Sequence, residues 1–280
     1  MWFDRFPFSQ QYFVGPLPVQ PYGLAYLLGF IVSYAWLVRP EARRRLRLEP
    51  HDVQRLLFYC LVAVLLGGRF GFVVADILDD PSRAQYYLDH PMAVIAFWQP
   101  GRTSFGGIFA VFGVMSVYSL RRGGWSYLKR LGDEVVTTLP LCFALVRFAT
   151  FLIGSIPGRL CVPVRPWCLH FAGIEGYRYP AAMIEGLLDL AMFGILLVIY
   201  LRSRASGLTG WSWVVLYGVV RLVAEIWREP GRTVGSLTDA QVVALAMILI
   251  GLAGLTARLF THAHGQGDRF ADRALQSAQE

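Results

Sequence analysis

Residues 141–159 read LCFALVRFATFLIGSIPGR, and the interpretation of the whole chain starts from this stretch. It is mostly apolar and close to the roughly 20 residues that a helix needs to cross the hydrocarbon core of a bilayer. Arg147 interrupts the run near its middle. A charge at that depth costs about 2.5–3.5 kcal/mol on insertion scales, so it needs a partner or a task. The stretch therefore predicts a transmembrane helix that carries a functional residue.

Similar apolar runs occur along nearly the whole chain. Of its 280 residues, 55% are hydrophobic and 16% are charged, whereas an ordinary soluble domain has roughly 25% charged residues. This composition excludes a soluble globular protein, a coiled coil and a disordered chain. We predict an all-α integral membrane protein, a bundle of about seven transmembrane helices. The predicted spans are residues 21–38, 54–78, 92–120, 135–156, 181–201, 211–227 and 239–259.

Two segments depart from plain spans. Gln99, Pro100, Gly101 and Arg102 interrupt the third run, which is typical of a re-entrant or broken helix that lines a polar cavity. Residues 262–280 form a polar tail, which we expect to be disordered and separate from a membrane domain of residues 1–261.

The distribution of arginine predicts the orientation. Cytoplasmic loops are enriched in Lys and Arg, and the basic residues collect after the first and third predicted spans. We therefore expect an external N-terminus, a cytoplasmic tail and, at residues 157–180, a small external cap. Because the basic residues lie between apolar runs, we interpret the net charge of +7 as a signal for membrane topology and expect no nucleic-acid partner. The basic residues are Arg39, Arg43, Arg44, Arg45, Arg47 and Arg55, then Arg121, Arg122, Lys129 and Arg130.

The four cysteines point to no metal site, because no CxxC or Cys/His spacing suits zinc. Cys161 and Cys168 fall within the predicted cap. In an oxidising compartment they could form a disulfide, and two free thiols are the alternative. No cofactor is expected.

Five charged residues lie within predicted spans: Arg69, Arg147, Glu185, Arg221 and Glu225. Around Arg221 the sequence reads LYGVVRLVAEIWREP, and helical spacing places Tyr217, Arg221, Glu225 and Arg228 on one face. Tyr217 and Arg221 together could hold an anion such as a phosphate. An internal salt-bridge network that only joins helices is the alternative, and we prefer it for Glu225 and Arg69.

Glu185 is either a partner for an arginine or an acid/base group, and the sequence does not separate these alternatives. Glycines are common at helix contacts in membranes. Tight packing is therefore the first interpretation of Gly106 and Gly107, while Gly154 and Gly158 would let a backbone or a lipid approach Arg147.

Seven strings, in order along the chain, resemble the prolipoprotein diacylglyceryl transferase family. They agree with that family in order, spacing and predicted topology. The strings are VGPLPVQPYGLAYLLGF (14–30), LLGGRFGFVV (65–74), FWQPGRTSFGG (97–107), LPLCFALVRFATFLIGSIPGR (139–159), YPAAMIEGLL (179–188), LYGVVRLVAEIWREP (216–230) and SLTDAQVVALAMILIG (236–251).

The resemblance implies a multi-pass enzyme of the bacterial cytoplasmic (inner) membrane. It would move diacylglyceryl from phosphatidylglycerol to the lipobox cysteine thiol in the signal peptide of a prolipoprotein, and release glycerol phosphate. By position, the resemblance matches Tyr22, Arg147, Gly154, Gly158, Tyr217 and Arg221 to family residues. We expect catalytic roles for Arg147, Tyr217 and Arg221, and substrate-binding roles for Tyr22, Arg69, Gly106, Gly107, Gly154, Gly158, Glu185 and Glu225.

The chain departs from the family pattern at neutral polar positions. The family's third-span string usually reads serine-phenylalanine-histidine-glycine-glycine, and here the histidine is replaced by Phe105 or deleted. The glycine-asparagine pair that follows Arg147 and Phe148 in the family pattern is Ala149 and Thr150. Because of these departures, a second interpretation stays open. The protein would then be a divergent paralogue that keeps the lipid-binding cavity but uses another acceptor, or that binds and moves phospholipid without catalysis.

A thiol that attacks the glycerol carbon needs cations to stabilise the departing phosphate. Arg147 and Arg221 can supply them. The acceptor of the thiol proton remains open, because the histidine suited to that task is missing. The candidates are Glu185, Glu225, Tyr217 and the phosphate itself.

Overall fold

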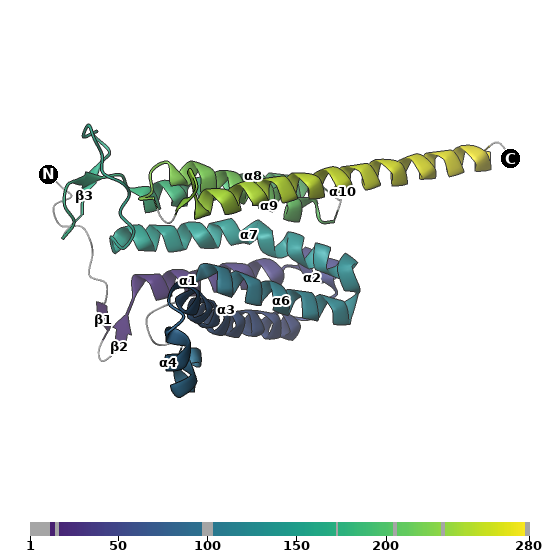
Figure 1. Cartoon of the computed structure of the whole chain (residues 1–280). Helices are drawn as coiled ribbons and strands as arrows, with labels where there is room; N and C mark the ends of the chain where they lie inside the picture. Colours follow the sequence, from purple (N-terminus) through teal and green to yellow (C-terminus); the bar gives the residue numbers. More distant parts are fainter. Residues whose placement is uncertain are drawn as a thin grey trace. The chain divides into compact units, whose positions relative to one another are not determined.

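The computed structural model describes residues 12–14, 17–96, 103–171, 173–203, 206–230 and 233–277, and helices dominate it (Figure 1). The chain forms two compact units, one of residues 34–131 and one of residues 1–33 with 132–280. Helices α1 (Pro21–Leu37) and α7 (Gly124–Leu152) each run through a boundary between the units.

The unit of residues 34–131 is built on two helices joined through glycine. It contains α2 (Pro40–Leu46), α3 (Pro50–Asp79), α4 (Arg83–Asp89), α5 (Pro91–Ile95) and α6 (Ser104–Arg122). Glu49 and Asp52 form a reciprocal capping box at the start of α3. Helices α3 and α6 approach so closely at Gly71 that a Cβ there would come within 2.8 Å of the Gly106 Cα.

The other unit is a helical bundle with three short hairpins. Its elements are β1 (Tyr12–Val14), β2 (Leu17–Val19), β3 (Leu169–His170), β4 (Tyr177–Arg178), α8 (Ala181–Arg202), α9 (Leu208–Glu225), β5 (Thr233–Val234), β6 (Leu237–Thr238) and α10 (Asp239–Ser277). Each hairpin is antiparallel, β1 with β2, β3 with β4 and β5 with β6.

Buried carboxylates of α7 fix the connection between α8 and α9. Asp133 accepts hydrogen bonds from the backbone N–H groups of Gly207, at 2.6 Å, and Gly210, at 3.0 Å. These donors lie at the start of α9, where backbone N–H groups have no partner within the helix. Glu134 accepts a hydrogen bond of 2.6 Å from the Tyr200 hydroxyl of α8.

The membrane character predicted from composition is confirmed. Within the described part of the chain, four helices are long and apolar enough to cross a membrane: α3, α7, α8 and the Asp239–Phe260 part of α10. The bent pair α1 and α2 would make five. Each predicted span overlaps a helix, but α6 and α9 do not meet the same test, so seven spans stay a prediction.

Three boundaries differ from the sequence-based expectation. Helix α7 begins at Gly124 and ends at Leu152, so the predicted span 135–156 starts too late and ends too late. Helix α9 ends at Glu225. The backbone of α10 continues to Ser277, through most of the tail predicted to be disordered. The interruption at Gln99–Arg102 lies outside the described residues.

Residues 157–180 carry the β3–β4 hairpin and a disulfide between Cys161 and Cys168. Of the two alternatives for these cysteines, the structure has the disulfide. The segment 158–161 also pairs with the backbone near β4, since Cys161 N–H donates to the Tyr177 carbonyl at 2.8 Å.

Candidate functional site

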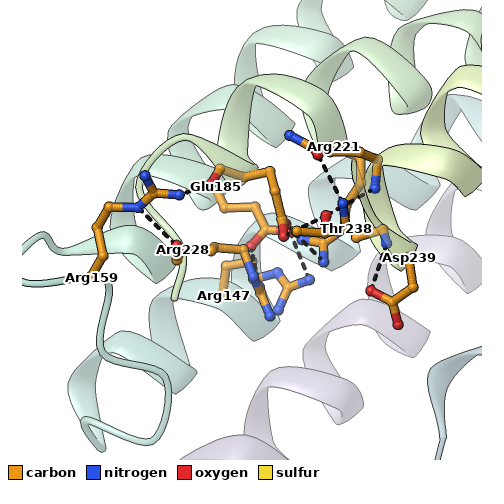
Figure 2. Close-up of polar contacts among 10 residues, drawn as sticks. Arg147, Arg159, Glu185, Arg221, Arg228, Thr238 and Asp239 are labelled. Carbon is orange, nitrogen blue, oxygen red and sulfur yellow. Dashed lines mark hydrogen bonds and ion pairs between the residues drawn. The ribbon is translucent and has the colours of Figure 1, made fainter. Parts of the chain in front are cut away.

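Three helices of the same unit bring together the charged residues that the sequence places inside the membrane. Arg147 comes from α7, Glu185 from α8 and Arg221 from α9. Figure 2 shows their side chains converging, with Arg228 joining from the segment that follows α9. Charges in a membrane interior are expected to pair with one another, and these residues do so.

Glu185 is the centre of this cluster. Its Oε1 lies 2.8 Å from Arg147 Nη2 and 3.5 Å from Arg221 Nη1, and its Oε2 lies 2.9 Å from Arg228 Nη1. The Glu185 side chain is 4% exposed, whereas the three arginine side chains are 21–25% exposed. The carboxylate is thus enclosed while its cationic partners remain partly accessible.

Glu225 extends the network toward α10. Its Oε2 lies 3.5 Å from Arg221 Nη2, one helical turn earlier, and its Oε1 accepts a hydrogen bond of 3.0 Å from the Thr238 hydroxyl. Thr238 and Gln241 exchange side-chain and backbone hydrogen bonds at the start of α10, which is a capping box. The capping box fixes the Thr238 side chain, and the Thr238 hydroxyl in turn fixes the Glu225 carboxylate.

Arg228 reaches Glu185 because the segment after α9 pairs with the segment after α7. Arg159 N–H donates to the Trp227 carbonyl at 3.0 Å, and Gly158 N–H donates to the Tyr179 carbonyl at 3.0 Å. The Arg159 side chain adds hydrogen bonds of 3.1 Å to the carbonyls of Glu225 and Arg228 (Figure 2). The expectation that Arg228 shares a helix face with Arg221 was wrong, since α9 ends at Glu225.

The two glycines after Arg147 have backbone roles. Gly154 has a φ of +64° and ends α7 in a Schellman motif, with Gly154 N–H bonded to the Phe151 carbonyl and Ser155 N–H to the Thr150 carbonyl. At Gly158 a Cβ would lie 2.5 Å from the carbonyl oxygens of both Trp227 and Tyr179. Gly158 therefore permits the backbone pairing that places Arg228.

Two predicted tyrosines belong to this unit but not to the ion-pair network. The Tyr217 ring stacks on Trp213 with centroids 5.3 Å apart and lies 5.7 Å from the Phe143 ring. The Tyr22 hydroxyl lies 3.0 Å from the Tyr26 hydroxyl on α1. Among the described residues, neither tyrosine forms an ion pair or a hydrogen bond with the cluster.

Arg69, Gly106 and Gly107 lie in the other unit. Arg69 is 4% exposed and donates to the Ala93 carbonyl from Nε at 3.1 Å and from Nη2 at 2.8 Å. It thus ties α3 to α5. Gly106 faces Gly67 and Gly71 of α3, and Gly107 faces Val64. The side chain of Phe105 lies outside the described part.

Asp189 and Arg159 are additions that the sequence reasoning missed. Asp189 follows Glu185 by one turn of α8, is 2% exposed, and its Oδ1 has no hydrogen-bond partner. An acidic residue four positions after Glu185 in an apolar run was the available signal. Arg159 carried no such signal, because it lies outside the predicted spans.

The cluster is suited to binding one phosphate diester. Its ion pairs join three guanidinium groups to two carboxylates, so among the ion-paired residues the cations outnumber the anions by one. Each guanidinium has five N–H donors, most of them not used by Glu185, and guanidinium forks match phosphate oxygens. In the described residues, no group of three or more His, Cys, Asp or Glu side chains could hold a metal.

Comparison with known proteins agrees with this chemistry. Residues 11–257 match the sequence model of the family described as prolipoprotein diacylglyceryl transferase. The phosphatidylglycerol–prolipoprotein diacylglyceryl transferase of Geobacter sulfurreducens is 32% identical over 250 residues, which cover 85% of this chain and 90% of the relative. The protein of the same name from Rhodospirillum centenum is 33% identical over 253 residues, 85% of this chain and 87% of the relative.

Proposed function

Because this chain belongs to the prolipoprotein diacylglyceryl transferase family, we propose that it transfers diacylglyceryl from phosphatidylglycerol to the cysteine thiol of a prolipoprotein. The observation that carries the proposal is the arrangement around Glu185. One buried carboxylate holds Arg147, Arg221 and Arg228 together while their side chains stay 21–25% exposed. A purely structural ion pair has no need to keep its cations accessible.

In the reaction, the cysteine sulfur forms a bond to the terminal glycerol carbon of the diacylglyceryl group. The bond between that carbon and the phosphate oxygen breaks, and its electrons leave with glycerol phosphate. Arg147 and Arg221 bind the phosphate oxygens and stabilise the charge that develops on them. Glu185 and Arg228 orient the two guanidinium groups, so little reorganisation is needed when the bond breaks.

The thiol proton must reach an acceptor. In the simplest scheme, the departing phosphate takes this proton. It gains a negative charge when the bond breaks, and the second pKa of a phosphate monoester is about 6. Asp189 is the alternative acceptor, since its buried carboxyl group has an oxygen without a partner one turn from Glu185. A thiol is acidic enough that this chain can work without the family histidine, at a reduced rate.

The proposal includes a location and a topology. The enzyme has seven spans in the bacterial inner membrane, an external N-terminus and a cytoplasmic C-terminus, and it acts on the lipobox cysteine of the signal peptide. The Cys161–Cys168 disulfide supports an external position for residues 157–180, because disulfides persist in oxidising compartments. The arginine-rich segments between spans support a cytoplasmic position for the opposite loops.

The test is a transfer assay with purified protein, phosphatidylglycerol and a lipobox peptide, read by mass spectrometry as the thioether product. We expect product from the wild type and a loss of about a hundredfold or more in Arg221→Gln and Arg147→Gln, the range for removing one oxyanion donor. Arg202→Gln is the matched control, because Arg202 is exposed at the end of α8.

Two outcomes would contradict the proposal. One is equal activity in all three variants, which would make the cluster structural. The other is no product from a wild-type preparation that still binds phosphatidylglycerol, with an active relative as positive control. That second result would favour a paralogue that binds or moves phospholipid without this chemistry.

A further inference from the structure

A second basic site lies in the unit of residues 34–131, apart from the residues assigned to transfer. Leu46, Arg47, Arg122, Tyr127 and Arg130 line a cavity of about 320 Å³. These residues come from the end of α2, the end of α6 and the first turns of α7. The volume is at the low end of the range for small-ligand sites, roughly 300–1,000 Å³.

The cations of this cavity are incompletely neutralised. Arg122 Nη2 lies 2.6 Å from Asp52 Oδ1, whereas neither Arg47 nor Arg130 forms an ion pair within the described part of the chain. The guanidinium carbon Cζ of Arg122 lies 4.9 Å from the centroid of the Tyr118 ring, and that of Arg130 lies 5.7 Å from the centroid of the Tyr127 ring. Among the described residues, one of the three guanidinium groups thus has a carboxylate partner.

Two buried polar atoms at the cavity lack hydrogen-bond partners. Tyr127 is 4% exposed, and its hydroxyl, which lies beside the Arg122 guanidinium, has no acceptor among the described residues. Arg130 Nε is also buried without a partner. Buried polar groups in proteins are nearly always satisfied, so an unsatisfied donor beside a cavity points to a ligand that supplies the acceptor. Both atoms can donate to an anion.

The end of α2 holds Arg47 at the cavity. Arg47 is the C-cap residue of α2 with φ 51° and ψ 49°, the left-handed conformation, which glycine adopts at little cost and other residues rarely adopt. Among the described residues, Arg47 is the only residue other than glycine that has a positive φ. This conformation closes α2, with the Arg47 and Leu48 N–H groups both bonded to the Arg43 carbonyl, so the end of the helix fixes the position of Arg47 in the cavity lining.

We propose that this cavity, the Arg47 cavity, binds the phosphate group of an anionic phospholipid. Arg47, Arg122 and Arg130 bind the phosphate oxygens, and the Tyr127 hydroxyl donates the remaining hydrogen bond. Arginine residues at the ends of apolar helices lie at the depth of the headgroups, where anionic lipids concentrate. Free inorganic phosphate shares the recognised chemistry, so the test separates the two sources.

The experiment titrates the detergent-solubilised full chain with three probes, namely dioctanoyl phosphatidic acid, dioctanoyl phosphatidylcholine and inorganic phosphate, and follows binding by native mass spectrometry. The test variant is Arg47→Gln/Arg130→Gln. The matched control is Arg44→Gln/Arg121→Gln, which removes the same charge from exposed residues outside the cavity. Tyr127→Phe is the milder variant if the double variant fails to fold.

We expect phosphatidic acid to bind the wild type more tightly than phosphatidylcholine does. Its affinity should fall about tenfold in Arg47→Gln/Arg130→Gln, the effect of losing a charged hydrogen bond, and about threefold in Tyr127→Phe. The control should change less than about twofold, because Arg44 and Arg121 do not line the cavity and can act on a bound lipid only as distant, screened charges. None of these residues belongs to the transfer cluster, so the result is independent of the transfer assay.

Equal weakening in the test and control variants would overturn the site and indicate general charge attraction. Equal affinity for phosphatidylcholine and phosphatidic acid would also overturn it. Competition by inorganic phosphate at the same affinity as phosphatidic acid would overturn the lipid assignment and leave free phosphate as the ligand.

Discussion

Glu185 forms ion pairs with Arg147, Arg221 and Arg228, which lie 36 to 43 positions from it along the chain. Removing the common partner of a buried ionic cluster costs more than the pairs contribute, because it leaves uncompensated charge. The side chain of Glu185 therefore has two effects, on stability and on the orientation of Arg147 and Arg221, and a conservative substitution can separate them.

We expect Glu185→Gln to lower the free energy of unfolding by about 3 kcal/mol, because three guanidinium groups lose their shared anion. Thermal unfolding in detergent measures the change. The exposed Glu175→Gln is the control and should leave the melting temperature unchanged. A melting temperature for Glu185→Gln equal to that of the control would show that the cluster does not hold α7, α8 and α9 together.

Gly158 contributes through its backbone alone. We expect Gly158→Ala to destabilise the protein by about 1–3 kcal/mol, because the added methyl group would meet two carbonyl oxygens that cannot move independently. Transfer activity should fall with it, since the same backbone pairing places Arg228. Gly194→Ala in α8 is the control, because no atom lies within 4 Å of its Cβ position. Similar unfolding of both variants would contradict the pairing argument.

At the scale of elements, the contact between α3 and α6 depends on glycines. Cβ atoms at Gly67 or Gly106 would overlap the backbone of the opposite helix. Small residues allow helices in membranes to approach closely, where van der Waals packing is the main attraction. This geometry accounts for Gly106 without a substrate role, and that role stays a prediction.

We expect Gly106→Ala to separate α3 from α6 and to lower thermal stability by about 1–3 kcal/mol. Gly113→Ala changes the same helix at a position with nothing within 4 Å, so it should be neutral. The two variants are compared by thermal unfolding and by the KM for phosphatidylglycerol. If Gly106→Ala raises KM at unchanged stability, Gly106 contacts the substrate and the packing interpretation is wrong.

At the scale of the whole molecule, the orientation in the membrane rests on the arginine-rich segments and on the disulfide. The segment with Asp80 and Ser82, before α4, belongs to the connection expected outside, and Ser126, in the first turn of α7, belongs to the side expected inside. Both serine residues are exposed. They can therefore report the topology by chemical labelling.

We expect Ser82→Cys to react with a membrane-impermeant maleimide in intact spheroplasts, and Ser126→Cys to react only after permeabilisation. Cys60 and Cys142, which are free, are replaced by serine in both variants, and the Cys161–Cys168 disulfide remains. The positive-inside distribution is the physical reason. The reverse labelling pattern would place the N-terminus in the cytoplasm and contradict the proposed orientation.

The amino-acid sequence by itself determined the membrane character, the approximate positions of the helices and the identity of the unusual charges. These properties depend on hydropathy and local periodicity, which each segment carries independently of the others. Arg147, Glu185, Arg221 and Glu225 stand out because a charge in an apolar run is costly wherever the run packs.

Only the tertiary structure decided which charges meet. Arg228 pairs with Glu185 because backbone hydrogen bonds join residues near 158, 179 and 227, and no local pattern encodes such distant pairing. The same applies to the disulfide, to the glycine contact of α3 with α6 and to the Arg47 cavity, whose arginines come from three helices. Each depends on which segments lie against one another in the folded chain, and contacts between segments distant in sequence form only when the chain folds.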